Sequence, residues 1–372
     1  MTLSAAEKPR DPHNDNAAGL RPEGSIESQG RRLVGETDRP MKAALHHMLH
    51  SRISTILALL VVVYLIFAST QSSFFTGSTL KLILLSSAAL FVTAIGLTFV
   101  LISGGFDLSV GSLLTLSGYF FAWLINSWNL PALWAMLCVV LFGVLVAGVT
   151  NGFLIGRLKL SFMIVTLGTM TLFGGLAQWI SLASEPIVGK SGQASFLQNS
   201  FYQGSVIGIP YPVLVCIVVF AAAAFVLRFT LFGRDVYSVG GNPTAARLSG
   251  INVPWTIVAV YAIAGGSGAL GAVISSSITS SAINTAGANV MLQAAAAVLV
   301  GGTSLRGGSG TVTGTAIGVL FFGVLHEGLQ RYNTAWEEII SGAIVVFAAL
   351  ADKVQRDGWA SLDIRALARQ RY

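Results

Sequence analysis

The sequence predicts an all-α polytopic membrane protein with about ten transmembrane helices. Of its 372 residues, 53% are hydrophobic and 10% are charged, and the mean hydropathy is +0.73. An average soluble domain is about 25% charged, so this chain could not cover a water-facing surface of its size. The 299 residues from Ile53 to Ala351 hold only 15 of the charged side chains. The composition excludes a soluble enzyme, and we expect no catalytic residues.

Charge and polarity divide the chain into three parts. Residues 1–50 are a polar leader with Pro, Gly and mixed charges, a composition typical of disorder. Residues 51–352 are the transmembrane domain, and residues 353–372 are a charged tail. His46, His47 and His50 could form a metal cluster or an interfacial turn before the first apolar run. We favour the turn and predict no metal site.

Ten apolar runs account for the transmembrane domain. A membrane-spanning helix needs about 20 mostly apolar residues, and Gly and Ser interrupt the later runs. The predicted helices are residues 53–70, 82–102, 108–125, 132–152, 162–182, 211–229, 254–274, 289–304, 311–330 and 338–351.

The distribution of Lys and Arg orients these helices. If the amino terminus is inside and the helices alternate, 19 basic residues fall on inner segments and 3 on outer segments. Cytoplasmic loops of membrane proteins carry an excess of Lys and Arg, so both termini are predicted to be cytoplasmic. Because the net charge of +6 is spread over these segments, we expect the lipid bilayer and no nucleic acid as a partner.

Two stretches match nucleotide-binding motifs without the structural context that those motifs need. Gly266–Gly271 fits G-x-G-x-x-G, but it lies within an apolar run with no strand before it. Ser184–Ser191 nearly matches a phosphate-binding loop, but it begins with Ser and falls on the predicted outer side. We therefore expect no cofactor in this chain, so the energy for any transport comes from a partner or an ion gradient.

Two glycine-rich stretches interrupt the apolar pattern. Gly104–Ser112 reads GGFDLSVGS and Gly301–Ser309 reads GGTSLRGGS, which agree at five of nine positions. Breaks in membrane helices are tolerated where they line a cavity in the protein. Asp107 can act as a cap for the following helix or contact a translocation path, and both interpretations stay open.

The longest polar inner segment between helices is Leu231–Val253. Asn242 suits an N-cap, Pro243 the first helical position and Gly250 the C′ position of a short helix. Because an isolated helix of this length is unstable, it should pack on something. The alternatives are a surface turn and a docking helix for a cytoplasmic partner.

Four motifs follow one another in order: GLTFVLISGGFDLSVGS (96–112), IVTLGTMTLFGGLA (164–177), FGRDVYSVGGNPTAARLSGI (232–251) and AVLVGGTSLRGGSGTVTGTAIG (297–318). On these motifs, the chain resembles the membrane permease subunits of ABC importers for monosaccharides of the ribose, xylose and galactose type. The resemblance covers about residues 50–352. It implies the permease fold of the ribose and branched-chain amino acid type, in the bacterial cytoplasmic (inner) membrane.

The resemblance also implies partners and an ATPase-coupling segment. The partners are a cytoplasmic two-domain ABC ATPase that hydrolyses ATP, an exported sugar-binding protein in the periplasm or outside the cell, and a second permease chain. That second chain is most simply an identical copy, with a heterodimer as the alternative. The residues that take the coupling role by resemblance are Arg234, Gly241, Asn242, Pro243, Ala245, Ala246, Arg247, Leu248, Gly250 and Ile251.

A path for a small uncharged solute is expected to be lined by hydroxyls, amides and aromatic rings. Each candidate also fits a helix–helix hydrogen bond, worth about 0.6 kcal/mol on average in a membrane. The candidates are Phe106, Asp107, Ser109, Thr166, Thr169, Gln178, Asn289 and Gln293.

The expected function is the membrane path of an ATP-driven importer for a monosaccharide or related polyol. The alternative is an ion-coupled secondary carrier, which needs paired charges within the membrane. Only Asp107 and Glu327 approach the deep spans, which favours the importer. The chain departs from the family pattern at Phe106, Met291–Gln293 and His326–Gly328. The last two departures leave the identity of the sugar open.

Overall fold

The computed structural model describes residues 52–183, 201–279, 286–330, 332 and 334–357. All of these residues belong to one compact unit that begins at Ser51. The predictions for the leader, for Ser184–Ser191 and for tail residues 358–372 lie outside the described residues.

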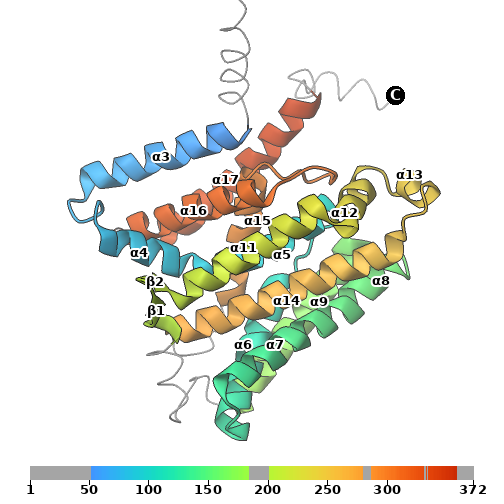
Figure 1. Ribbon diagram of the computed structural model, residues 1–372, viewed down its shortest axis with the longest axis horizontal. Helices are drawn as coiled ribbons and strands as arrows, with labels where there is room; N and C mark the ends of the chain where they lie inside the picture. Colours follow the sequence, from blue (N-terminus) through green and yellow to red (C-terminus); the bar gives the residue numbers. More distant parts are fainter. Residues whose placement is uncertain (1–51, 184–200, 280–285, 331, 333, 358–372) are drawn as a thin grey trace, which may run out of the picture. The chain divides into compact units, whose positions relative to one another are not determined.

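The described part of the chain is almost entirely helical (Figure 1). One short antiparallel hairpin pairs β1 (Ser205–Val206) with β2 (Ile209–Pro210). The helices are α3 (Arg52–Thr70), α4 (Gly77–Ser86), α5 (Ala88–Ile102), α6 (Val110–Trp128), α7 (Ala132–Ala147), the π-helix η1 (Gly148–Gly152), α8 (Phe153–Gly156), α9 (Phe162–Ala183), α11 (Tyr211–Phe229), α12 (Leu231–Gly241), α13 (Pro243–Leu248), α14 (Val253–Thr279), α15 (Ala286–Val300), α16 (Val312–Leu329) and α17 (Thr334–Asp357).

Each predicted apolar run corresponds to a helix or to consecutive helices, which confirms the all-α polytopic class. The number of spans is a different matter. Among the described residues, six helices are long and apolar enough to cross a membrane, and α4 with α5 would add a seventh if this pair, bent by 45°, is one span. α3 and α15 contain apolar helices that are shorter. The predicted count of ten is therefore not confirmed.

α14 packs against α5, α6 and α7, and glycines bring the backbones together. A Cβ at Gly143 of α7 would meet the carbonyl oxygen of Gly265 in α14, and a Cβ at Gly265 would meet that of Gly143. Small residues allow such close approach between membrane helices. The stretch Gly266–Gly271 lies inside α14, so it is part of a helix-packing surface and not a nucleotide-binding loop.

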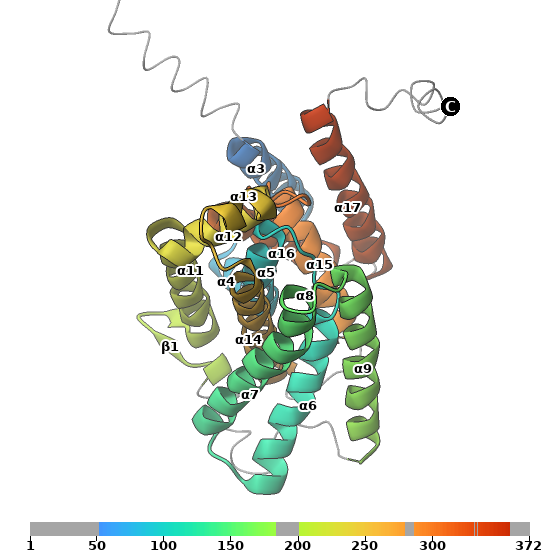
Figure 2. The same ribbon diagram turned by 90° about the vertical axis from the view of Figure 1, so that its right-hand side faces the viewer.

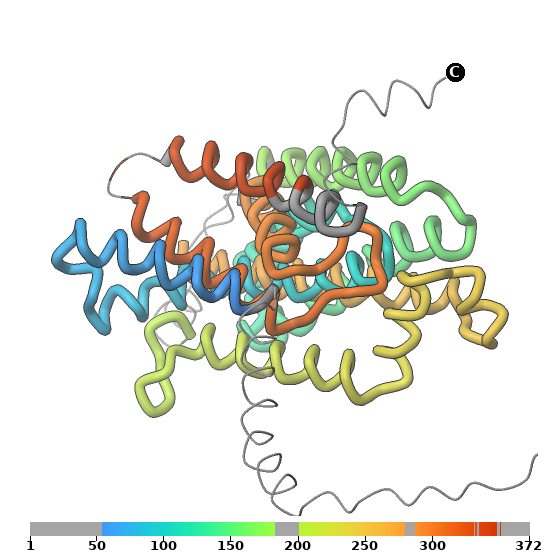
Figure 3. Tube along the Cα trace, turned by 90° about the horizontal axis from the view of Figure 1, so that it is seen from above, coloured from blue at the N-terminus to red at the C-terminus, as the bar shows by residue number. Residues whose placement is uncertain are grey.

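The length of α14 separates two ends of the bundle. α13 immediately precedes α14, and the β1–β2 hairpin lies near the far end of α14 (Figure 1). A helix of 27 residues is about 40 Å long. Figures 2 and 3 show α17 along one side of the bundle and α11 along the other. α15 contacts α5, α6, α16 and α17, so it lies among these helices.

Candidate functional site

The segment predicted to dock on a partner folds as two consecutive helices, α12 and α13, which we call the docking hairpin. Asn242 Oδ1 accepts hydrogen bonds from the backbone N–H groups of Thr244 and Ala245, both at 3.0 Å. This satisfies two of the unpaired donors at the start of α13. Pro243 occupies the first helical position. The predicted N-terminal end of this helix is confirmed.

The end of α13 is a Schellman motif. Gly250 has a φ of +85°, a conformation that strains residues with a Cβ. Its N–H donates to the carbonyl of Arg247 at 3.0 Å, and the N–H of Ile251 donates to the carbonyl of Ala246 at 3.1 Å. These are the two bonds that define the motif. The predicted C′ role of Gly250 is confirmed.

The exposed face of α13 differs from the prediction at one residue. Ala246 is buried against Val239 and Val253, so it points into the protein and cannot present itself to a partner. Ile251 is half-buried beside the same cluster. The predicted coupling residues that are exposed are Arg234, Gly241, Asn242, Pro243, Ala245, Arg247, Leu248 and Gly250.

The two glycine-rich stretches of the sequence meet each other and the docking hairpin. A Cβ at Gly307 would meet the backbone of Gly104, and a Cβ at Gly240 of α12 would meet Ile102 O and Gly308 N. The N–H of Gly308 donates to Ile102 O at 2.8 Å. We call Gly104, Gly240, Gly307 and Gly308 the glycine junction.

A tyrosine adds a direct hydrogen bond beside this junction. Tyr237 of α12 donates its hydroxyl to the carbonyl of Gly310 at 2.8 Å. Gly310 immediately precedes Thr311, the N-cap of α16. The docking hairpin is therefore linked to the loops that end α5 and begin α16.

Four predicted path residues lie around a buried polar cluster. Asp107 is 1% exposed, and its Oδ1 accepts from the N–H and hydroxyl of Ser109 at 2.8 and 2.6 Å. Asn151 of η1 donates to the Ser109 hydroxyl at 2.6 Å, and Thr169 of α9 donates to Asn151 Oδ1 at 2.8 Å. The Phe106 carbonyl accepts a hydrogen bond from the Tyr261 hydroxyl of α14 at 3.3 Å.

The cluster corrects one detail of the prediction and adds a residue. The N-cap of α6 is Ser109, and Asp107 precedes it while accepting its N–H. Burial raises the pKa of Asp107 above its usual value, and the hydrogen bonds from Ser109 and Asn151 offset only part of that rise. Asn151 was missed by the sequence analysis, although a polar residue in an apolar run is itself a functional signal.

The other predicted path residues lie apart from this cluster and not all in one place. Thr166 is buried, and its hydroxyl donates to Phe162 O at 2.7 Å, a bond within its own helix and not the bond between helices considered as the alternative. Gln178 is exposed on α9. Asn289 and Gln293 line a cavity. The eight candidates therefore do not form one continuous surface.

The cavity has a volume of about 410 Å³ and lies between α5, α14, α15, α16 and α17. Pockets for small molecules measure about 300–1,000 Å³, so it can hold a single sugar. Its polar lining residues are Ser86, Ser87, Ser275, Thr279, Asn289, Gln293, His326, Glu337 and Glu338.

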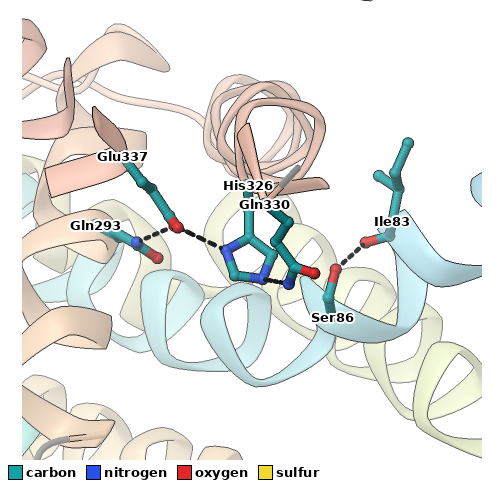
Figure 4. Close-up of polar contacts among 6 residues, drawn as sticks. All are labelled: Ile83, Ser86, Gln293, His326, Gln330 and Glu337. Atoms are coloured by element: carbon teal, nitrogen blue, oxygen red, sulfur yellow. Dashed lines mark hydrogen bonds and ion pairs between the residues drawn. The ribbon is translucent and has the colours of Figure 1, made fainter. Parts of the chain in front are cut away.

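Side chains from three helices form a hydrogen-bonded network in the lining of this cavity (Figure 4). Gln293 of α15 donates its amide to Glu337 Oε1 at 2.7 Å. His326 Nδ1 of α16 lies 2.8 Å from the same oxygen. His326 Nε2 lies 2.8 Å from the Gln330 amide. Glu337, in the first turn of α17, therefore ties that helix to α15 and α16.

One hydroxyl of the cavity has no partner among the described residues. Ser87, at the bend between α4 and α5, is 5% exposed, and its Oγ makes no hydrogen bond there. The Oγ occupies the space that a Cβ at Gly323 of α16 would need. Leaving a buried hydroxyl unpaired costs about 1–3 kcal/mol, and this Oγ is covered by protein atoms, so it does not itself face the space in the cavity.

The docking hairpin and the cavity lie at opposite ends of α14. Val253 opens α14 directly after the hairpin, whereas Ser275 and Thr279 at its other end line the cavity. α5 also runs from Ser87 at the cavity to Ile102 at the glycine junction. α5 thus connects the cavity to the glycine junction, and α14 connects the cavity to the docking hairpin.

Comparison with known proteins identifies relatives of the chain. A family model described as branched-chain amino acid transport system / permease component matches residues 79–349. The ribose import permease RbsC of Haemophilus influenzae is 38% identical over 79% of this chain and 90% of the relative. RbsC of Escherichia coli K12 is 35% identical, covering 80% of this chain and 92% of the relative. The D-allose permease AlsC of that strain is 33% identical, covering 80% and 90%. No solved structure matches significantly.

Proposed function

This chain belongs to the branched-chain amino acid transport system permease family, and we propose from that membership that it forms the membrane path of an ATP-driven importer for a monosaccharide or related polyol. The relatives named for ribose and D-allose support the solute class. They also favour an ATP-driven importer over an ion-coupled carrier. The polar lining and size of the cavity fit a molecule with several hydroxyl groups.

The observation that carries this proposal is the placement of the cavity and the docking hairpin at opposite ends of α14. A pump powered by a cytoplasmic ATPase needs a solute entrance on one side of the membrane and an ATPase contact on the other. A helix of about 40 Å exceeds the roughly 30 Å hydrocarbon core. The two ends can therefore reach the two faces of the bilayer.

The docking hairpin is assigned to the cytoplasmic face. Arg228, Arg234 and Arg247 lie on or beside it, and basic residues favour the cytoplasmic side. The predicted placement of both termini in the cytoplasm follows from the same rule. The cavity, at the other end of α14, then opens to the outside, where an exported binding protein would deliver the solute.

The exposed face of α13 is the proposed contact for the ATPase. Leu248 is 86% exposed, and an apolar side chain displayed beside Arg247 suits a protein partner. The Schellman motif and the buried Ala246 fix the orientation of this face. Movement of the hairpin would reach α5 and α16 through the glycine junction.

A second copy of this chain is the proposed partner within the membrane. An ATPase with two nucleotide-binding domains offers two contacts, and one chain supplies one docking hairpin. Twofold symmetry then calls for two permease chains, most simply identical. The mass of the detergent-purified complex distinguishes two copies of this chain from one copy with a different permease.

Reconstitution tests the proposed function. The chain would be placed in liposomes with a two-domain ATPase and an exported sugar-binding protein from the same genome, and uptake of radiolabelled D-ribose, D-galactose and D-allose measured. We expect uptake of at least one sugar that requires ATP and all three components. Uptake driven by an ion gradient without the ATPase would show a secondary carrier instead.

A further inference from the structure

The cavity carries an excess of negative charge. Its ionisable lining residues among those that the structure describes are His326, Glu337 and Glu338, and no Lys or Arg is among them. If His326 is protonated, it balances one carboxylate; if it is neutral, it balances none. Either state leaves at least one uncompensated negative charge, so the sign does not depend on the histidine.

The same lining is rich in groups that bind hydroxyls. Asn289 lines the cavity, is exposed and can both donate and accept hydrogen bonds. The Glu337 carboxylate is held in place by Gln293 and His326. Carboxylate oxygens accept from hydroxyl groups, and charged acceptors make the stronger hydrogen bonds. A solute covered with hydroxyl donors therefore matches this surface.

A solute that carries a negative charge is disfavoured by the same surface. Clefts lined by one sign of charge, with low-dielectric walls, concentrate ions of the opposite sign and repel those of the same sign. The walls here include the apolar side chains of Leu90, Val290 and Phe322. A carboxylate or phosphate on the solute would also find no basic side chain among the described lining residues to pair with it.

We propose that Glu337 and Glu338 make this cavity a charge filter, which admits uncharged polyhydroxy solutes and disfavours their carboxylated or phosphorylated derivatives. The filter would act after the exported binding protein has made its own selection. This inference rests on the proposed function in one respect, the opening of the cavity to the outside. Its own content is the sign of the electrostatic potential and the residues that set it.

Reaction rates of charged thiol reagents measure that potential without a known substrate. A cysteine would be placed in the cavity by Asn289→Cys, in a full-length chain with Cys138 and Cys216 replaced by Ser. Methanethiosulfonates with a cationic, a neutral or an anionic group would then be applied from outside. The matched control is Ser205→Cys on β1, which is exposed and outside the lining of the cavity.

We expect the ratio of cationic to anionic rates to be roughly tenfold higher at position 289 than at position 205, as in other clefts of one charge sign. Glu338→Gln should lower the ratio at position 289, and Glu338→Lys should lower it further. Glu337→Gln should also lower it. Glu338 tests the filter even if Glu337→Gln disturbs folding, because Glu338 is exposed. Because the test uses the full-length chain, the measured ratio includes the charge of Arg331, which lies outside the described residues.

The outcomes separate the two proposals. If the neutral reagent fails to reach position 289 from outside, the opening of the cavity to the outside is wrong. If the neutral reagent reacts there but the charge ratio equals that at position 205, the charge filter is wrong. A ratio that does not respond to any Glu338 substitution would also overturn it.

Discussion

The cavity and the glycine junction, at opposite ends of α14, are held together by different kinds of contact. At the cavity end, contacts between helices pass through ionisable and polar side chains, with Glu337 bonded to Gln293 and His326. At the other end, the glycine junction joins three segments through backbone atoms alone, with Gly240 packed against Ile102 O and Gly308 N. Side chains allow chemical selection, whereas backbone contacts transmit displacement with little slack. The difference indicates recognition at the cavity and mechanical linkage at the glycine junction.

The largest effect on stability is expected from a new buried charge in the docking hairpin. Ala246→Asp would bury a carboxylate against Val239 and Val253, where an unpaired charge costs about 3–5 kcal/mol. We expect a large fall in the midpoint of thermal unfolding in detergent.

The neighbouring Ala245→Asp is the control, because Ala245 is exposed. It should unfold like the unsubstituted chain and should lose substrate-stimulated ATP hydrolysis in the reconstituted complex, since its charge lies on the proposed ATPase contact. Equal thermal stability of the two variants would contradict the assignment of Ala246 to the interior.

Adding one methyl group to the junction should have the next largest effect. A Cβ at Gly240 would collide with Ile102 O and Gly308 N, whereas a Cβ at Gly241 meets nothing within 4 Å. Gly240→Ala should therefore destabilise the protein by about 1–3 kcal/mol through overpacking. Gly241→Ala is the control and should be nearly neutral. Similar unfolding midpoints for both variants would show that the backbone contact is not tight.

A smaller effect is expected from the hydrogen bond beside the junction. Tyr237→Phe removes the bond to Gly310 O, worth about 1 kcal/mol, and keeps the ring. We expect the amount of sugar transported per ATP hydrolysed to fall while ATP hydrolysis persists. Ser238→Ala on the same helix, whose hydroxyl donates to Arg234 O within that helix, should leave that ratio unchanged. A matching loss in Ser238→Ala would remove the special role of Tyr237.

The smallest effect on stability is expected at the cavity. Ser87→Ala deletes a hydroxyl that has no partner among the described residues, so the unfolding free energy should change by less than about 0.5 kcal/mol or rise slightly. Sugar uptake should also be unchanged, because the Oγ is covered by protein atoms and does not reach the solute. A fall in sugar uptake without a loss of stability would show that the solute does reach Ser87.

Local features of this molecule could be predicted from the sequence. Apolar runs marked the helices because a bilayer demands them, and Asn242, Pro243 and Gly250 marked α13 because helix ends have strong residue preferences. Ala246 was misplaced because six residues give too few turns to define an inner face. That face is set by Val239 and Val253 on other helices.

Features that depend on distant contacts could not be predicted. Ser87, Gln293, His326 and Glu337 come from four separate segments, and only the fold brings them to one cavity. The likeness between Gly104–Ser112 and Gly301–Ser309 was visible, but their meeting at Gly240 was not. Conversely, Gln178 had the residue type expected of a path and lies exposed on α9.

Two-sided labelling of single cysteines tests most directly whether the two ends face opposite sides of the membrane. Asn289→Cys in the cavity and Ser238→Cys on the docking hairpin would each be made in a chain lacking Cys138 and Cys216. An impermeant thiol reagent would then be added to intact cells. Position 289 should react at once, and position 238 only after permeabilisation. Reaction of both positions in intact cells, or of position 238 alone, would contradict an outer cavity linked to a cytoplasmic docking hairpin.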